Sequence, residues 1–255
     1  MIPAKVIRQK RLGEEYFLLE LEAPEVAEKA LPGQFVRLSA WPGNDPLLPR
    51  PFSVHEVEGA RISVLYQVRG RGTRILSALR RGDEVKVDGP LGRPFPVPDA
   101  GPVWVIAGGI GVAPFLFYLE TLKARGVPRR LFYGARSRGD LLRISRLARL
   151  SPLIVTTEDG SAGRRGLVTE ALSEALTRER PAMILACGPP AMLSAVGRIA
   201  GEAGIPTWLS LEAVMACGRG LCLGCAVPRR DGGYLKVCVE GPAVGLREVD
   251  LDALT

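Results

Sequence analysis

The sequence has little of what a membrane protein, an exported protein or a nucleic-acid-binding protein would carry. It contains no run of about 18 apolar residues, so no membrane-spanning helix is predicted. Its first 21 residues, MIPAKVIRQKRLGEEYFLLEL, hold no apolar signal core. Only 6% of the residues are aromatic, and the basic residues behind the net charge of +7 are spread among acidic ones. We therefore expect a cytoplasmic protein that binds neither a membrane nor nucleic acid.

Histidine is almost absent, whereas cysteine is concentrated in one place. His55 is the only histidine, and four of the five cysteines lie within the 22 residues from Cys217 to Cys238. Disulfides are rare in the cytoplasm, so this clustering needs another chemical explanation.

The spacing of apolar residues predicts a multi-domain β and α/β protein. Residues 1–95 alternate between apolar and polar side chains in six short stretches, which favours a small antiparallel barrel or sandwich. The stretches are 4–9, 16–23, 35–40, 52–57, 60–68 and 84–90.

The pattern changes at Gly101, where apolar strands begin to alternate with amphipathic helices, as in a Rossmann-like parallel sheet covered on both faces. We expect helices at 113–124, 140–150, 167–176 and 190–203. The expected domains are an antiparallel β-barrel at 1–97, the α/β domain at 98–209, and a small cysteine-containing domain at 210–255 with little core of its own.

The four clustered cysteines follow the pattern C-x4-C-x2-C-x12-C. They are Cys217, Cys222, Cys225 and Cys238. The spacings among the first three cysteines are those of plant-type [2Fe–2S] ligation, and the intervening glycines allow the loop to bend and turn amide hydrogens toward sulfur. Structural zinc is an alternative, although zinc ribbons favour paired C-x2-C knuckles and often include histidine. Unrelated buried cysteines are a third interpretation, and a ligand set made only of cysteine excludes a Rieske centre.

Two glycine-containing turns indicate a nucleotide site. The turn GGIGVAP, at 108–114, follows an apolar strand and opens a helix, where amide hydrogens and the helix dipole attract a pyrophosphate. The turn CGPP, at 187–190, ends a later strand that should lie at the same carboxyl edge of the sheet. The alternative is that these turns serve packing alone.

Two motifs stand out in the β domain. In Arg50-Pro51-Phe52-Ser53, Arg50 could pair with a phosphate and Ser53 could hydrogen-bond a ring nitrogen. The main chain of Gly72 and Thr73 could meet a second phosphate. An ordinary strand entry and an ordinary turn are the alternatives.

In this order, the motifs RPFS, LYQVRGRGT, GPLG, GGIGVAP, YGAR and CGPPAM resemble the ferredoxin–NADP reductase superfamily over essentially the whole chain. The C-terminal motifs SLE, MACG and CVEGP narrow the resemblance to electron-transfer subunits of NAD-dependent dihydroorotate dehydrogenases of pyrimidine biosynthesis. The resemblance implies that the β domain binds FAD, that NAD(H) is a substrate and that the tail carries a [2Fe–2S] cluster. By this resemblance, the residues that bind FAD are Arg50, Pro51, Phe52, Ser53, Leu65, Tyr66, Gln67, Gly72 and Thr73. Those that border the nicotinamide nucleotide are Gly108, Gly109, Gly111, Pro114, Cys187, Gly188 and Pro189. The iron ligands are Cys217, Cys222, Cys225 and Cys238.

The resemblance also implies a partner, a catalytic FMN-containing dihydroorotate dehydrogenase subunit, in a heterotetramer of two plus two subunits. A nicotinamide exchanges two electrons and a [2Fe–2S] cluster exchanges one, so the flavin must stand between them. A catalytic barrel alone takes about 250 residues, so dihydroorotate oxidation requires that partner. Cys187 would shape the pocket beside the nicotinamide, or it is a plain buried thiol.

Two other functions remain open at this point. Small subunits of NADH-dependent ferredoxin:NADP oxidoreductases and of sulfhydrogenase-type complexes share the three-part layout, but in the ferredoxin-linked relatives an Asp typically replaces the first cluster cysteine, here Cys217. The alternative outside redox chemistry is a nucleotide-binding regulator with a structural zinc tail.

The nucleotide preference can be predicted from two acidic residues. NADP-specific members of the superfamily place Ser and Arg after the strand that here reads PLIVTT, whereas this chain has Glu158 and Asp159. Carboxylates repel a 2′-phosphate and accept hydrogen bonds from ribose hydroxyls, which favours NAD. Arg136 and Arg138 follow the preceding strand and could offset this effect, and a surface turn without ligand contact is the alternative.

Overall fold

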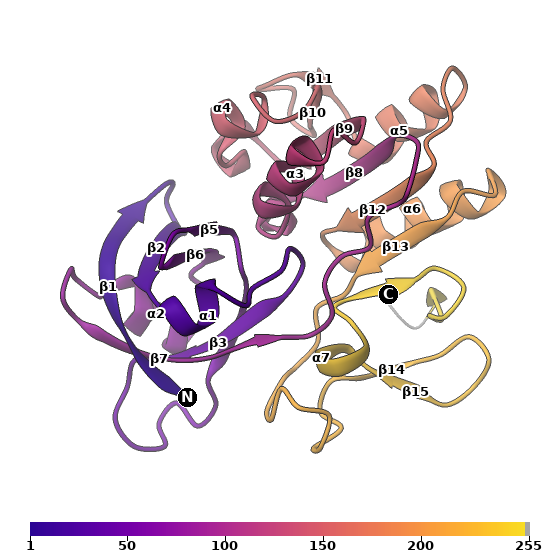
Figure 1. Ribbon diagram of the computed structural model, residues 1–255. Helices are drawn as coiled ribbons and strands as arrows, with labels where there is room; N and C mark the ends of the chain where they lie inside the picture. The colour runs from indigo at the N-terminus through magenta and orange to yellow at the C-terminus, as the bar shows by residue number, and fades with distance from the viewer. Residues whose placement is uncertain (253–255) are drawn as a thin grey trace.

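A computed structural model describes residues 1–252, and it divides the chain into a curved antiparallel sheet, a mostly parallel sheet with helices, and a C-terminal tail (Figure 1). The antiparallel sheet has the strand order β4-β3-β7-β1-β2-β6-β5, and among the described residues no ladder joins its two end strands. Its strands are β1 (Ile2–Arg11), β2 (Tyr16–Glu22), β3 (Phe35–Ser39), β4 (Arg50–Ser53), β5 (Glu56–Glu58), β6 (Arg61–Gln67) and β7 (Glu84–Leu91).

The predicted antiparallel β fold of this region is confirmed, although the ladders of the described residues form an open sheet and not a closed barrel. One strand also differs from the prediction. Buried and exposed residues alternate in β1, where Ala4 and Val6 face the core, because successive side chains point to opposite faces of a strand. The stretch predicted as one strand at 52–57 is two strands, because the chain turns inward at Val54 and His55, both completely buried. Two short helices, α1 (Pro24–Ala27) and α2 (Arg71–Ser77), pack beside this sheet.

The second sheet has the order β11-β10-β9-β8-β12-β13-β16, and all its neighbours are parallel except the last pair. Its strands are β8 (Val103–Gly108), β9 (Arg129–Ala135), β10 (Leu153–Thr157), β11 (Arg164–Arg165), β12 (Met183–Cys187), β13 (Thr207–Ser210) and β16 (Ala243–Gly245). Between them lie η1 (Gly109–Val112), α3 (Phe115–Ala124), η2 (Arg138–Asp140), α4 (Ile144–Leu147), α5 (Val168–Leu176) and α6 (Pro190–Glu202).

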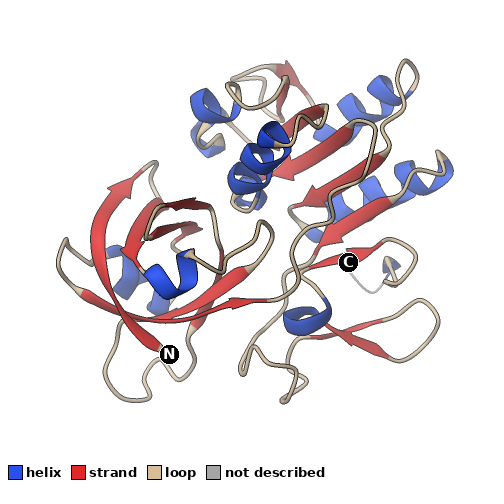
Figure 2. Ribbon diagram, viewed as in Figure 1, coloured by secondary structure: helices blue, strands red, loops and turns tan. Residues whose placement is uncertain are grey.

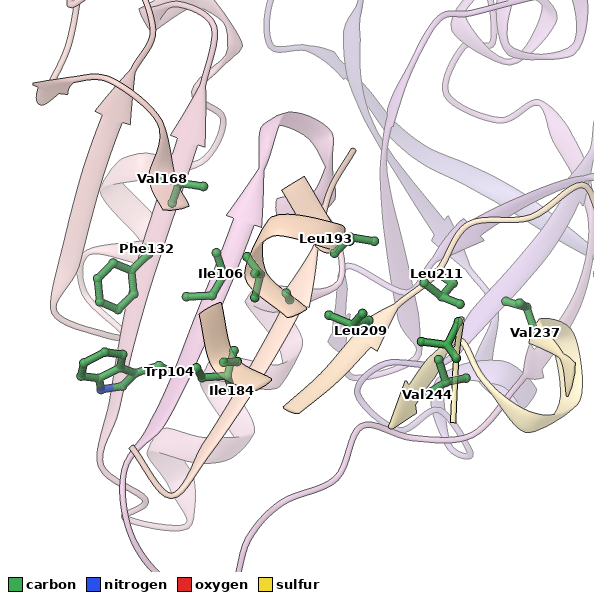
Figure 3. Close-up of a cluster of buried hydrophobic side chains, with 14 of the residues drawn as sticks. Trp104, Ile106, Phe132, Val168, Ile184, Leu193, Leu209, Leu211, Val237 and Val244 are labelled. Atoms are coloured by element: carbon green, nitrogen blue, oxygen red, sulfur yellow. The ribbon is translucent and has the colours of Figure 1, made fainter. Parts of the chain in front are cut away.

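Helices cover both faces of this sheet, as predicted (Figures 1 and 2). Alternate residues of β8 enter different cores: Trp104 and Ile106 pack with α5 and α6, whereas Val103 and Val105 pack with α3. Figure 3 shows the first of these clusters. None of the helices within residues 1–252 is both long and apolar enough to cross a lipid bilayer.

The helix predicted at 140–150 is wrong in extent, because α4 spans only Ile144–Leu147. Arg143 adopts a left-handed conformation with φ of 60°, which a continuous helix does not allow. Its guanidinium turns inward and pairs with Glu56 of β5, 3.4 Å away. A contact with the antiparallel domain therefore sets the local conformation here.

The tail has more core than its sequence suggests. It contains β14 (Ala226–Pro228), β15 (Tyr234–Lys236) and α7 (Val237–Glu240) before β16, and the rest is mostly loop (Figure 2). Leu235, Val237 and Val244 are buried and belong to the same cluster as the α5–α6 face of the sheet. Val237 and Val244 are labelled in Figure 3. That cluster also includes Phe35 and Leu91 of the antiparallel sheet, so the tail packs against both larger regions.

His55 joins the antiparallel domain to the first turn of the α/β domain. Its Nδ1 atom lies 2.6 Å from the carbonyl oxygen of Ala113, and its own carbonyl accepts a hydrogen bond from the Phe117 amide at 3.1 Å. The ring is completely buried, and among the described residues Nε2 has no hydrogen-bond partner. Burial lowers the pKa of His55 to about 3; the carbonyl of Ala113 opposes this shift, and the charges of Arg143 and Arg146 add to it.

This pKa predicts a pH dependence of stability. Unfolded histidine titrates near pH 6.5, so between pH 6.5 and about 3 the unfolded chain binds a proton that the folded chain does not. The free energy of unfolding should therefore fall as the pH drops below about 6.5, and His55 should account for about 2 kcal/mol of the decrease at pH 5. The variant His55→Asn keeps an N–H donor for Ala113 without titrating in this range, and should lose that contribution.

Chemical unfolding of both proteins at pH 7.5 and pH 5 measures the difference. The same pH dependence in both proteins would contradict the assignment to His55.

Candidate functional site

The two glycine-containing turns meet at the carboxyl edge of the parallel sheet. They follow β8 and β12, which are adjacent parallel strands. A side chain at Gly111 would place its Cβ 2.4 Å from the Cys187 carbonyl oxygen, and one at Gly108 would place it 2.6 Å from the sulfur of Met192. Gly109 has a φ of 53°. The structure thus brings together the predicted residues Gly108, Gly109, Gly111, Pro114, Cys187, Gly188 and Pro189. Gly108 and Gly111 are buried against the second turn, where only glycine fits, whereas Gly109 is half-buried and a Cβ there would meet nothing within 4 Å, so its main chain is open to a pyrophosphate.

Cys187 ends β12 as a protonated thiol. It is 4% exposed, and burial raises its pKa to about 12, with a further contribution from the charge of Glu212. Its thiol is hydrogen-bonded to the side chain of Ser210, the residue paired with it on β13. A thiol held neutral in this way is suited to forming the wall of a pocket and not to acting as a nucleophile.

Glu212 is a charged neighbour of Cys187 that was not predicted from the sequence. Its side chain reaches solvent, yet the surrounding protein desolvates the carboxyl group and raises its pKa, against the opposing charge of Arg69. The residue lies 25 positions from Cys187 in sequence, and only the pairing of β13 with β12 brings it near that thiol. The motif SLE was the signal, but nothing local in it indicates this neighbour.

The acidic pair predicted to select the nucleotide also lies at this edge. Glu158 and Asp159 follow β10, and both are exposed. Asp159 Oδ1 accepts hydrogen bonds from the Ser161 hydroxyl at 2.6 Å and the Ser161 amide at 2.9 Å, which lower the pKa of Asp159. Arg136 and Arg138 follow β9; the Arg136 guanidinium is exposed, 3.8 Å from Asp140, and the Arg138 amide donates to Ser161. The edge therefore carries an ionised carboxylate with two arginines on the adjacent loop.

The flavin motifs converge on the antiparallel domain. Arg50, Pro51, Phe52 and Ser53 form β4 and are half-buried. A Cβ at Gly72 would lie 3.0 Å from Arg50 Nε, so the arginine rests directly against the start of α2. The Arg50 guanidinium also lies over the ring of Trp41, 5.6 Å from its centroid, a neighbour that the sequence did not indicate. A guanidinium beside glycine main chain fits the pyrophosphate of FAD.

The side chains of the other predicted flavin-binding residues are buried or hydrogen-bonded within the protein. The Thr73 hydroxyl accepts hydrogen bonds from the Arg69 and Gly70 amides. Leu65 and Tyr66 are 2% and 1% exposed, and the Tyr66 hydroxyl accepts a hydrogen bond from Gln9. Gln67, at the end of β6, is half-buried and donates to Glu15. Thr73, Leu65 and Tyr66 can therefore offer FAD mainly their main-chain groups.

The four tail cysteines lie in two pairs. The Sγ atoms of Cys225 and Cys238 are 3.1 Å apart, and both residues are 2% exposed. Cys217 contacts Cys222, and this outer pair is accessible from the surface. Main-chain amides surround the sulfurs. Cys217 Sγ accepts hydrogen bonds from the amides of Arg219, Leu221 and Cys222. The other three sulfurs accept one each: Cys222 Sγ from the Gly224 amide, Cys225 Sγ from the Cys238 amide and Cys238 Sγ from the Gly220 amide.

This donor set fits a binuclear iron–sulfur cluster. Amide hydrogens directed at sulfur stabilise the negative charge of such a cluster, and the amides of Arg219 and Cys222 lower the pKa of Cys217 to about 6. Gly218 and Gly220 have φ values of 65° and 76°, which allow the loop to turn these amides inward. Within residues 1–252, no three His, Cys, Asp or Glu side chains surround a single ion position. Paired sulfurs suit two irons better than one tetrahedral zinc.

Comparison with known proteins agrees with this division of the chain. Residues 212–250 match the family model described as the iron–sulfur cluster binding domain of dihydroorotate dehydrogenase B, and residues 105–198 match the oxidoreductase NAD-binding domain. The chain is 37% identical to the dihydroorotate dehydrogenase B (NAD(+)) electron transfer subunit of Desulforamulus reducens, over 94% of each chain. It is 35% identical to the same subunit of Caldanaerobacter subterraneus, over 96% of this chain and 97% of that protein.

A solved structure of the NADH-dependent reduced ferredoxin–NADP oxidoreductase, studied for flavin-based electron bifurcation, contains a chain of the same fold. The alignment covers 100% of this chain and 92% of that one, with a TM-score of 0.90 and 30% sequence identity.

The paired cysteines generate a metal-removal prediction. The variant Cys222→Ser should lose iron and the visible absorbance above the flavin bands, because a hydroxyl replaces an outer thiolate. FAD should stay bound, since Arg50 and Gly72 lie in a different region. Iron, sulfide and flavin analysis measures this, with Cys187→Ser as the control that keeps its iron. A wild-type protein containing one zinc and no iron or sulfide would contradict it.

The acidic pair generates a second prediction. NADH should be preferred over NADPH by at least about tenfold in kcat/KM, a difference of about 1.4 kcal/mol. The double variant Glu158→Gln, Asp159→Asn should reduce this preference, because it removes the charge that repels a 2′-phosphate. Steady-state kinetics with both nucleotides test it, and equal kcat/KM values for wild-type protein would rule it out.

Proposed function

We propose the function of this chain from the family to which it belongs, the electron transfer subunits of NAD-dependent dihydroorotate dehydrogenase B. The chain is an oxidoreductase subunit that passes electrons between NAD and a catalytic subunit, through FAD and an iron–sulfur cluster. In the direction of dihydroorotate oxidation, the substrate loses two electrons and two protons on the partner, NAD⁺ takes up two electrons and one proton to become NADH, and the second proton is released to solvent. FAD supplies the exchange between hydride and single electrons.

The observation that carries this proposal is the position of the cysteine loop, residues 217–225. The tail packs against both sheets, so the cysteines lie where the FAD-binding and NAD-binding regions adjoin. Cys225 and Cys238 are buried on the inner side, and Cys217 and Cys222 lie toward the surface. This arrangement keeps the cysteines close to both cofactor-binding regions and leaves one pair at the surface, where an electron can pass to or from a partner.

We further propose the residues that act at each site. Arg50 and the main chain of Gly72 and Thr73 hold the FAD pyrophosphate, and Ser53 faces the ring system. Cys187, with its neighbour Glu212, bounds the nicotinamide pocket and excludes water from it. The four tail cysteines hold [2Fe–2S]. We assign these roles to an FAD-binding domain at 1–97, an NAD-binding domain at 98–209 and a cluster-binding domain at 210–255.

We propose that the surface around the outer cysteine pair receives the catalytic subunit. Leu221 and Val214 are 82% and 78% exposed, and Leu223 is 63% exposed with a φ of 58°. Apolar side chains held outward beside redox ligands suit a protein interface. We expect the partner to carry FMN and the assembly to contain two subunits of each kind. Five cysteines without disulfides support a cytoplasmic location.

A second candidate is a subunit of an NADH-dependent ferredoxin–NADP oxidoreductase. The 0.90 TM-score of that structure favours it, whereas the cysteine at position 217 favours the dihydroorotate complex, because ferredoxin-linked relatives are expected to carry Asp there. The two candidates are therefore distinguished by the identity of the partner with which the cluster exchanges electrons.

The proposal predicts that the isolated chain oxidises NADH but cannot oxidise dihydroorotate. Purified alone, it should reduce ferricyanide with NADH, because FAD and the nicotinamide site lie within it. It should show no dihydroorotate–NAD⁺ activity until the catalytic subunit is added, since all three regions are committed to other cofactors. Activity assays with gel filtration of the mixture provide the measurement. Dihydroorotate turnover by this chain alone, or failure of the two subunits to associate, would contradict the proposed function.

A further inference from the structure

The cysteine loop lies directly on a buried arginine of the antiparallel domain. Arg37, on β3, is 8% exposed and donates from Nη1 to the carbonyl of Ala216, the residue before Cys217. A Cβ at Gly218 would lie 2.9 Å from Arg37 Nε and 3.2 Å from Leu91 Cδ1. Only glycine at this position lets the loop pass so close to the guanidinium.

Asp88 completes the contact from the neighbouring strand. It lies opposite Arg37 in the pairing of β7 with β3 and is 6% exposed. Its Oδ2 atom accepts from Arg37 Nε at 3.0 Å and from Nη2, and its Oδ1 atom accepts from Arg219 Nη2 at 2.6 Å. Burial alone would raise the pKa of Asp88, but the two arginines lower it, so the carboxylate stays ionised.

These hydrogen bonds anchor the main chain on one side of Cys217 and a side chain on the other. Residue 216 is held by Arg37 and residue 219 by Asp88, so the first cysteine is tied to the antiparallel domain. Cys225 and Cys238 are instead buried in the core that the tail shares with the parallel sheet. The two cysteine pairs are thus positioned by different parts of the fold.

We propose that the Arg37–Asp88–Arg219 bridge is a positioning device that holds the outer cysteine pair, and with it the cluster, against the FAD-binding domain. The role of the bridge in electron transfer rests on the proposed function, whereas its role in holding the loop rests on the hydrogen bonds alone. The bridge carries two positive charges and one negative, so it also places a net positive charge beside a thiolate site. Removal of Arg37 therefore loosens the loop and makes addition of an electron to the cluster harder.

The test compares full-length protein loaded with FAD and cluster. In Arg37→Gln, amide hydrogen exchange across residues 216–221 should accelerate by at least about tenfold, and the midpoint potential of the cluster should shift to more negative values. FAD content should not change, because Arg50 and Gly72 are untouched. Arg37→Lys keeps the charge without the planar fork, so exchange should rise while the potential stays closer to wild type.

Arg219→Gln guards against a variant that fails to fold, since the Arg219 side chain is 60% exposed. It should move both readouts in the same direction by a smaller amount. Arg164→Gln, which breaks an exposed ion pair with Glu174 in the parallel-sheet region, is the matched control and should change neither.

Wild-type exchange rates and potential in Arg37→Gln and Arg219→Gln, with the cluster present, would overturn the inference while leaving the proposed function intact. A wild-type protein without iron and sulfide would instead refute the proposed function. In that case exchange at residues 216–221 still decides whether the bridge holds the loop.

Discussion

The arrangement of the sites depends on the antiparallel pairing of β16 with β13. This short ladder returns the end of the chain to the parallel sheet, with the Leu211 amide bonded to Pro242 and the Leu246 amide to Thr207. The segment between the two strands is thereby closed into a loop, and its Leu235 and Val237 are buried against the sheet. The cysteine loop consequently lies beside the antiparallel domain, and Glu212 lies beside Cys187.

The same residue type serves opposite purposes because of its surroundings. Cys187 is kept protonated by burial and by the nearby charge of Glu212. Cys217 accepts three main-chain hydrogen bonds, which favour the thiolate that iron requires. The difference lies in the glycine-rich backbone that follows Cys217, since positive φ angles at Gly218 and Gly220 direct amide hydrogens to the sulfur side.

Features encoded locally could be predicted from the sequence, and features that depend on distant contacts could not. The cysteine spacing and the two glycine turns need only neighbouring residues, and the alternation of β8 with α3 follows from periodicity. The helix expected at 140–150 failed because Arg143 is drawn to Glu56, 87 residues earlier. Arg37 looked like an ordinary strand residue, because its buried partners come from β7 and the tail. Glu212 and Trp41 were missed for the same reason.

The short strands at the two ends of the parallel sheet have a consequence for how the protein meets other chains. One end is β16, three residues long, and the other is β11, which consists of Arg164 and Arg165. A long unpaired strand invites a foreign strand to add to the sheet, whereas a two- or three-residue edge, charged at one end, offers few main-chain bonds. Association by strand addition is therefore disfavoured here. Contacts with another protein fall to side chains and loops, which can release as well as bind.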